Sequence, residues 1–487
     1  MLTKWGKALE KEHILPEYPR PQFRRSNCEI LNGVWEYAIS SVTLQIPPER
    51  FEGNILVPFS PESELSGVNR TLKPKDCLWY RRSIEAPLGF DANTEDLILH
   101  FGAVDQFVEV RLNGVTLAHH AGGYLPFSVV LSDAWVNDIP NELVVRVRDE
   151  TDTSCWSRGK QSSKPGGIWY TPQSGIWQTV WLERAPKRRI ESVIITPLFD
   201  QGAAEFTIWT NCGGAGIVQL LGNETVFLSG TPHRLSKEGF TTRSPEEPNL
   251  YEVSMTFERD VVESYFAMRK FAVEQDEQGI ARLFLNNKPY FHNGVLDQGY
   301  WPDGLYTAPS DEALIEDIQL MKELGFNTLR KHIKIEPLRW YYHCDRLGML
   351  VWQDMVNGGG TYSKPAIALP LIFGNAHPDS DYAYFAREEV RGREAYQREM
   401  HETVALLYNC PCIAMWVPFN EGWGQFDANR AVDAIRAMDG TRTIDHASGW
   451  HDQKGGDVKS LHVYYKPYRF SADANGRAVV LSEFGGY

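Results

Sequence analysis

The periodicity of the sequence changes near residue 276, and this change constrains the fold more than any other feature. Beyond it, short apolar segments alternate with longer segments whose apolar residues recur every three or four positions. That alternation is typical of βα units around a parallel sheet. Repeated over about 200 residues, it predicts a (β/α)8 TIM barrel in 276–487, with active-site groups just after the carboxyl ends of its strands.

One helix of this region is marked clearly by its residues. Ser310, Asp311 and Glu312 supply a capping hydroxyl and early acids, and apolar residues at helical spacing then lead to Gly325. Apolar runs predict further barrel strands at 327–330, 349–352, 413–417, 443–445, 458–463 and 478–481. The Gly- and Pro-rich stretch from about 357 to 385 is predicted to be irregular, and a loop of that length is a candidate wall of an active site.

The residues before 276 predict two β domains. In 107–115, apolar and polar residues alternate before an Asn-Gly turn, and 141–148 alternates as a strand with one wet face. Such signals predict a jelly-roll β-sandwich in 1–185. The stretch 186–275 has turn signals between short strands and the size of an immunoglobulin-like β-sandwich. Three domains agree with a length of 487 residues, because a single core stops growing at roughly 250 to 300.

The composition narrows the set of partners. A formal net charge of -14 argues against nucleic acid and anionic membranes, which are bound by basic faces. The sequence contains neither an apolar run of about 18 residues nor an N-terminal run of signal-peptide length, so we expect a soluble, cytoplasmic protein. It also lacks a Gly-rich phosphate loop and a dinucleotide fingerprint, and no organic cofactor is expected.

The cysteines predict neither disulfides nor a metal site. They number seven and are scattered along the chain, which favours reduced thiols over a disulfide framework. Cys410 and Cys412 could supply two ligands of a metal site, but the sequence contains no second Cys or His pair at ligand spacing.

Two glutamates follow apolar strands of the predicted barrel, Glu421 within 416–424 and Glu483 within 479–486. An isolated glutamate at a strand end is most often a solvated acid, but a barrel delivers two such residues to one face. Hydrolysis of a glycosidic bond with retention needs one protonated and one ionised carboxyl group, roughly 5 to 5.5 Å apart. The pattern therefore predicts a catalytic pair.

Further motifs surround this pair. Asn420 precedes Glu421, Ser482 precedes Glu483, and distinctive segments occur at 31–35, 79–82, 175–183 and 284–289. With these motifs, over nearly its whole length, the chain resembles glycoside hydrolase family 2, which includes β-galactosidases, β-glucuronidases and β-mannosidases. The resemblance implies a retaining exo-β-glycosidase that acts on carbohydrate, with Glu421 as acid/base and Glu483 as nucleophile.

The resemblance and the strand ends also suggest contacts for the sugar. By resemblance, Asn420 hydrogen-bonds the 2-hydroxyl beside the nucleophile, and Tyr464 donates a hydrogen bond to Glu483. Their positions near strand ends make four further residues candidates for the pocket, although each could equally be an ordinary structural residue: Trp450, His332, Asp297 and Trp301. Asp354 also ends a strand, and we expect its side chain to brace the barrel mouth.

The motifs do not determine which sugar is cleaved. β-Galactosidase activity is the first expectation, and β-glucuronidase or β-mannosidase activity is the alternative. Residues 296–298 stand where galactosidases and glucuronidases show a His-Glu pair, and 330–333 replaces their Arg-x-x-His. Residues 351–355 are closer to the mannosidase branch. A catalytically inactive carbohydrate-binding relative and a purely structural scaffold compete with the enzyme hypothesis. A magnesium or sodium ion and a homo-oligomer are compatible with the family, but no ion ligands are predicted.

The chain ends at Tyr487, just after the predicted seventh strand. A barrel without its eighth strand would expose apolar faces and an unpaired edge. We therefore expect that the sequence is a piece of a longer protein.

Overall fold

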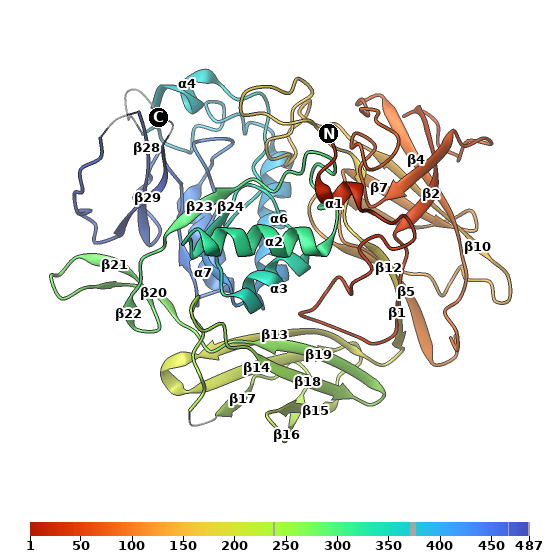
Figure 1. Ribbon diagram of the computed structural model, residues 1–487, viewed down its shortest axis with the longest axis horizontal. Helices are drawn as coiled ribbons and strands as arrows, with labels where there is room; N and C mark the ends of the chain where they lie inside the picture. The colour runs from red at the N-terminus through yellow and green to blue at the C-terminus, as the bar shows by residue number, and fades with distance from the viewer. Residues whose placement is uncertain (237–238, 371–375, 466, 486–487) are drawn as a thin grey trace.

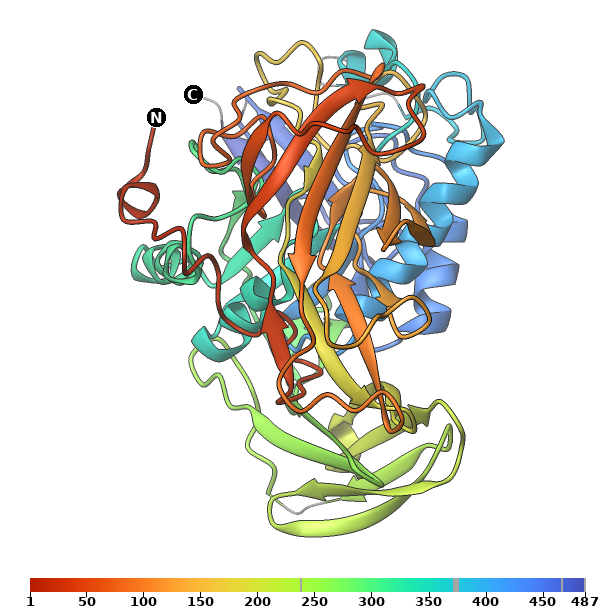
Figure 2. The same ribbon diagram turned by 90° about the vertical axis from the view of Figure 1, so that its right-hand side faces the viewer.

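The computed structural model describes residues 1–236, 239–370, 376–465 and 467–485. Two β units and one strand–helix unit lie against one another (Figure 1), with the first β unit on the right, the second at the bottom and the strand–helix unit in the centre and left. Figure 2, in which the first unit faces the viewer, shows the second unit beneath both of the others. None of the helices among the described residues is long and apolar enough to cross a membrane.

The first β unit consists of two antiparallel sheets that share one core. The six-stranded sheet has the order β3 (Gly53–Val57), β2 (Gly33–Ser41), β4 (Asp76–Ile84), β10 (Asn141–Arg148), β7 (Phe107–Leu112), β8 (Val115–Ala121). The four-stranded sheet has the order β1 (Cys28–Ile30), β12 (Val180–Pro186), β5 (Glu95–Phe101), β9 (Phe127–Val130). The predicted Asn-Gly hairpin is confirmed between β7 and β8, where Asn113 and Gly114 both have positive φ. Alternate residues of β7 are buried, as a strand with one wet face requires.

The second β unit is also built from two antiparallel sheets around a core of its own. One sheet has the order β13 (Ile190–Leu198), β14 (Ala203–Thr210), β17 (His233–Ser236). The other has the order β16 (Asn223–Leu228), β15 (Ala215–Leu220), β18 (Tyr251–Phe257), β19 (Asp260–Phe266). Phe206, Val218 and Met255 lie in the core that holds the two sheets together.

Among its described residues, the strand–helix unit contains seven parallel strands in two groups. A five-stranded sheet has the order β23 (Gly294–Asp297), β24 (Thr328–Lys331), β25 (Leu350–Asp354), β26 (Ile413–Val417), β27 (Thr443–Ile444). A parallel pair consists of β28 (Val458–Tyr464) and β29 (Ala478–Gly485). The intervening helices are α2 (Asp311–Glu323), α3 (Leu338–Leu347), α6 (Val390–Leu407) and α7 (Ala428–Met438). Every residue of β26 is buried, because this strand is covered on both faces.

Shorter elements complete the described chain. The sheet of β20 (Phe271–Gln275), β21 (Ala281–Leu285) and β22 (Lys288–Pro289) packs Phe271 and Leu285 into a core with barrel residues such as Leu350 and Ala414. β6 (Val104–Asp105) and β11 (Gly175–Ile176) form an antiparallel pair. The other short elements are α1 (Lys4–Lys7), a 3-10 turn (Phe199–Gln201) and α4 (Lys364–Ile367).

Local sequence signals explain several of these elements. Ser310 caps α2, because its hydroxyl accepts a hydrogen bond from the backbone N–H of Ala313, and the predicted helix is confirmed. The stretch predicted to be irregular, 357–385, includes the short helix α4, and its residues 371–375 lie outside the described residues. All seven cysteines are free thiols, as their number and scatter predicted.

Candidate active site

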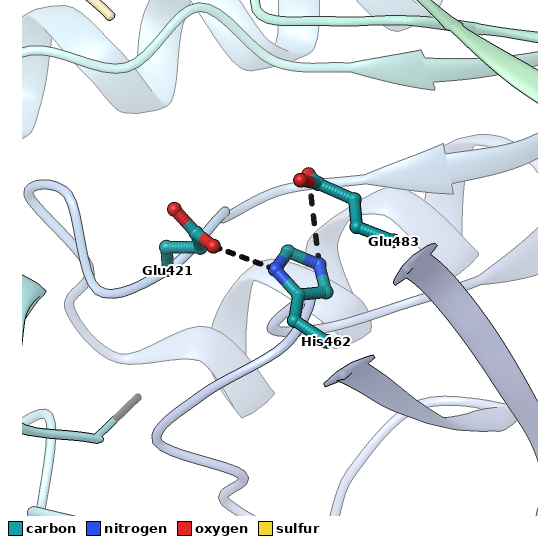
Figure 3. A group of neighbouring side chains, drawn as sticks. All are labelled: Glu421, His462 and Glu483. Carbon is teal, nitrogen blue, oxygen red and sulfur yellow. Dashed lines mark hydrogen bonds and ion pairs between the residues drawn. The ribbon is translucent and has the colours of Figure 1, made fainter. Parts of the chain in front are cut away.

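Glu421 and Glu483 converge at the carboxyl ends of β26 and β29, on either side of His462 (Figure 3). One carboxylate oxygen of each glutamate and one ring nitrogen of His462 all lie within 4.8 Å of one another. A retaining glycosidase needs its two carboxyl groups about 5 to 5.5 Å apart, whereas an inverting one needs about 6.5 to 9.5 Å. The observed spacing therefore fits retention.

The backbone holds Glu421 in an uncommon conformation. Its φ of 49° lies in the left-handed region, which costs a non-glycine residue on the order of 1 kcal/mol. The N–H of Glu421 donates to the carbonyl of Ser448 at 2.9 Å, and Asn420 and Ser448 form a parallel bridge. These contacts tie the residues after β26 to those after β27, so the carboxylate is placed by two strand ends.

Glu483 is surrounded by groups that favour its ionised form. The guanidinium of Arg330 lies 3.0 Å from its Oε1, and the hydroxyl of Tyr464 donates to its Oε2. Burial by itself would raise the pKa of Glu483, but the charges of His462 and Arg330 and the Tyr464 bond lower it from 4.5 to about 2. A carboxylate that stays ionised is suited to attack an electrophilic carbon.

Arg330 joins Glu483 to two further residues. Its guanidinium binds both oxygens of Asp354, at 3.0 and 3.1 Å, and donates to Oδ1 of Asn420 at 2.8 Å. Because an arginine can only donate, Oδ1 of Asn420 faces it and Nδ2 points elsewhere. That buried Nδ2 has no hydrogen-bond acceptor among the described residues, so it is available to a hydroxyl group of a ligand.

His462 is the residue between the two glutamates, and its side chain is fully buried. Its Nδ1 lies 2.8 Å from Oε1 of Glu421, while its Nε2 lies 3.1 Å from Oγ of Ser448 and 3.6 Å from Oε1 of Glu483. His462 and Glu483 are direct partners across the β28–β29 pair. The close approach requires a glycine at 449, since a Cβ there would lie 2.5 Å from the His462 ring.

The same three residues offer enough ligand atoms for a cation, but their surroundings disfavour one. The guanidinium of Arg330 contacts Glu483 directly and carries a fixed positive charge. A divalent ion at this position would have to share that carboxylate with a cation, which electrostatic repulsion opposes.

His332 and Trp450 also lie near the pair. Nδ1 of His332 is 2.9 Å from Asp354, which itself binds Arg330, so Asp354 braces the barrel mouth. Burial lowers the pKa of His332, although the hydrogen bond to Asp354 acts to raise it. The ring of Trp450 packs edge-on against His462 at 6.2 Å, one residue beyond Gly449.

Asp297 and Trp301 are not brought to the pair. Asp297 forms an ion pair of 2.8 Å with Lys331, whose ammonium also lies over Trp340 of α3. Side chains alternate along β24, so Arg330 faces the barrel interior while Lys331 and its partner Asp297 face the helices. Trp301 packs against the core on that same helix side.

Sequence reasoning did not single out Arg330 or His462 as site residues. A signal existed for His462, because it stands two residues before Tyr464 on one strand and so faces the same side. Arg330 is likewise two residues before His332. Neither signal says which distant carboxylate such a side chain meets.

Comparisons with known proteins agree with this barrel. The family model described as "Glycosyl hydrolases family 2, TIM barrel domain" matches residues 278–478. The β-glucuronidase of Homo sapiens is 23% identical over 451 residues, which cover 80% of this chain and 63% of that protein. The β-galactosidase of Thermoanaerobacter pseudethanolicus is 23% identical over 414 residues, which cover 79% of this chain and 50% of that protein.

The fold has a counterpart among solved structures. The β-D-glucuronidase structure of Dictyoglomus thermophilum superposes with a TM-score of 0.73 at 20% identity, covering 96% of this chain and 84% of that one. The chain thus spans between half and two thirds of the length of the two curated relatives, and most of the solved structure. The match shows that residues 278–478 form a TIM barrel domain of glycoside hydrolase family 2, and the curated relatives and the solved structure agree with it.

Proposed function

We propose that this protein removes terminal β-linked sugars from small glycosides or oligosaccharides, with retention of configuration at the anomeric carbon. The observation that carries the proposal is the convergence of Glu421 and Glu483 within 4.8 Å at one barrel mouth. The membership of the barrel domain in a family of O-glycosyl hydrolases supports it.

The reaction proceeds in two displacements. A carboxylate oxygen of Glu483 forms an ester bond with the anomeric carbon, and the departing glycosidic oxygen takes the proton of Glu421. Glu421 then removes a proton from water, whose oxygen attacks the anomeric carbon and releases Glu483 as a carboxylate. Nδ2 of Asn420 donates to the 2-hydroxyl, and Tyr464 keeps one oxygen of Glu483 in place. These steps use side chains of this chain alone and no organic cofactor.

The sugar that the comparisons favour is a β-glucuronide. A relative of known sequence and a solved structure with the same fold both carry the name β-glucuronidase. A β-galactoside, the first expectation from the sequence, is the second candidate, because another relative is named β-galactosidase. We further propose that 1–185 is a jelly-roll domain and 186–275 an immunoglobulin-like domain, since each contains two antiparallel sheets around one core.

The test is a panel of nitrophenyl β-glucuronide, galactoside, mannoside and glucoside. We expect turnover of at least one substrate, with the β-anomer as the first product in proton NMR spectra. The variants Glu483→Gln and Glu421→Gln should each lower kcat/KM on the order of 10³-fold or more. Glu323→Gln, an exposed acid at the end of α2, serves as the matched control.

Two outcomes would contradict the proposal. The α-anomer as first product would establish inversion. Full activity of Glu483→Gln would show that Glu483 is not the nucleophile. Binding of the sugars without turnover by the unaltered protein would favour an inactive carbohydrate-binding relative instead.

A further inference from the structure

A loop of the first β unit, residues 153–172, reaches the barrel mouth (gold, near the top of Figure 1) and is fastened there. Ser157 pairs with Gly358 as an antiparallel bridge, and the N–H groups of Arg158 and Gly159 donate to the carbonyl of Asn357 at 2.9 and 3.1 Å. The Arg158 guanidinium donates to the carbonyl of Gly360 at 3.0 Å. The loop is therefore a fixed part of the wall around the site.

This loop places Lys160 beside the catalytic pair. Lys160 is only 7% exposed, and its ammonium lies 5.4 Å from the ring centre of Trp423, two residues after Glu421. The same ammonium lies 5.9 Å from the ring centre of Tyr170, which follows later in this loop. Within the described parts of the chain, the ammonium makes neither a hydrogen bond nor an ion pair of 4.0 Å or less.

The charge of Lys160 is thus held near Glu421 and Glu483 without a direct partner among the described residues. Burial lowers the pKa of its ammonium, while the charges of Glu483 and Glu421 raise it from a distance. The guanidinium of Arg330, a fixed cation of the same pocket, is paired with both Asp354 and Glu483. A largely buried charge is stabilised when an opposite charge meets it directly, and an anionic group of a ligand would supply such a contact here.

We propose that Lys160 binds the carboxylate of a uronic acid in the sugar pocket, so that a loop of the first domain selects uronides over neutral sugars. The inference rests on the proposed glycosidase activity and assigns the residue that selects its substrate. A glucuronide and a glucoside differ only in the carboxylate or hydroxymethyl group on C5 of the ring. The ammonium forms a charge-assisted hydrogen bond with the carboxylate of the glucuronide, but only an ordinary hydrogen bond with the hydroxymethyl group of the glucoside.

The experiment compares Lys160→Met with the unaltered protein on nitrophenyl β-glucuronide and β-glucoside. We expect the ratio of kcat/KM for glucuronide over glucoside to fall about 10- to 100-fold, since a hydrogen bond between charged groups is lost. Lys164→Met changes an exposed lysine of the same loop and should leave the ratio as it is. Circular dichroism and the Tm show that each variant is folded.

A second measurement does not depend on any variant. Free D-glucuronate should inhibit the unaltered protein at least about 10-fold more tightly than D-glucose does, if an ammonium in the pocket meets the carboxylate. Equal inhibition by the two sugars would overturn the inference.

The remaining outcomes separate this inference from the proposed function. An equal fall in both substrates for Lys160→Met would mean that Lys160 acts on the glutamates and not on the sugar, which overturns the inference. An unchanged ratio would do the same. If the unaltered protein cleaves only neutral glycosides, the glycosidase proposal stands and the role of Lys160 falls, whereas inactivity on the whole panel removes the glycosidase proposal itself.

Discussion

At the scale of single residues, two glutamates acquire different chemistry from different neighbours. The carboxylate of Glu483 accepts hydrogen bonds from Arg330 and from the Tyr464 hydroxyl, whereas the carboxylate of Glu421 contacts the His462 ring. The pKa of Glu483 falls to about 2 in the fold, below the 4.5 of an unperturbed glutamate. Its ionisation therefore stabilises the fold above about pH 4.5, and this contribution is lost as the pH falls toward 2.

Replacement of Tyr464 tests this division directly. Tyr464→Phe removes a hydrogen bond that favours the ionised form, so the pKa of Glu483 rises and the acidic limb of the kcat/KM profile moves to higher pH. We expect kcat/KM near neutrality to fall about 10- to 100-fold. Tyr465→Phe is the control, because that neighbouring side chain is 78% exposed. A Tyr464→Phe profile that coincides with that of the unaltered protein would contradict the assigned contact.

At the scale of elements, a partly buried ion pair joins α2 to α3. Both oxygens of Asp311, the first residue of α2, lie 2.6 Å from the guanidinium of Arg339, and one lies 2.9 Å from Nε2 of His343. Burial would raise the pKa of Asp311, but Arg339 and His343 hold it well below 3.8. The pair therefore stabilises the fold above that pH, and its contribution is lost as the pH falls through the lowered pKa.

Asp311→Asn should lower the free energy of unfolding by about 3 kcal/mol at pH 7, because it leaves the Arg339 charge partly buried without its partner. The difference from the unaltered protein should shrink as the pH is lowered toward 3, which denaturant unfolding at several pH values would measure. Glu312→Gln, an exposed acid of the same first turn, is the control. If the difference in the free energy of unfolding grew as the pH fell, the fold would not lower the pKa of Asp311.

At the scale of the whole molecule, the site belongs to more than one unit. The barrel supplies both glutamates, whereas the loop that carries Lys160 comes from the first β unit and is fastened by Arg158. Trp169 of the same loop packs against Tyr362 and Trp423 at the mouth. Separating the two units would therefore dismantle one wall of the pocket.

Arg158→Ala should release this wall. Two barrel carbonyls, those of Gly359 and Gly360, lose a charged donor, which we expect to lower the free energy of unfolding by about 2 kcal/mol. The KM for nitrophenyl glycosides should rise more than kcat falls, because the carboxylates stay in place, and limited proteolysis should cut within 153–172. Lys164→Ala changes the same loop without touching the barrel and is the control. Unchanged KM and proteolysis would contradict a positioning role.

Local signals in the sequence were sufficient for several features. The capped helix after Ser310 and the Asn-Gly hairpin follow from short-range chemistry, and both glutamates were recognisable as acids that end apolar strands. Asp297 was misleading, because its place after a strand says nothing about whether it faces the sugar or the helices. The neighbouring register, Asp297 beside Lys331, decided that question.

The sequence by itself determined the order of the β and βα units and the two residues that carry the proposed chemistry, because periodicity, caps and turns act over a few neighbouring residues. Only the tertiary structure decided which side chains meet: His462 between the glutamates, Arg330 on Glu483, and Lys160 from another unit. The reason is physical. A local pattern reports which face of a strand is buried, whereas the partner of that face depends on the packing of the entire chain.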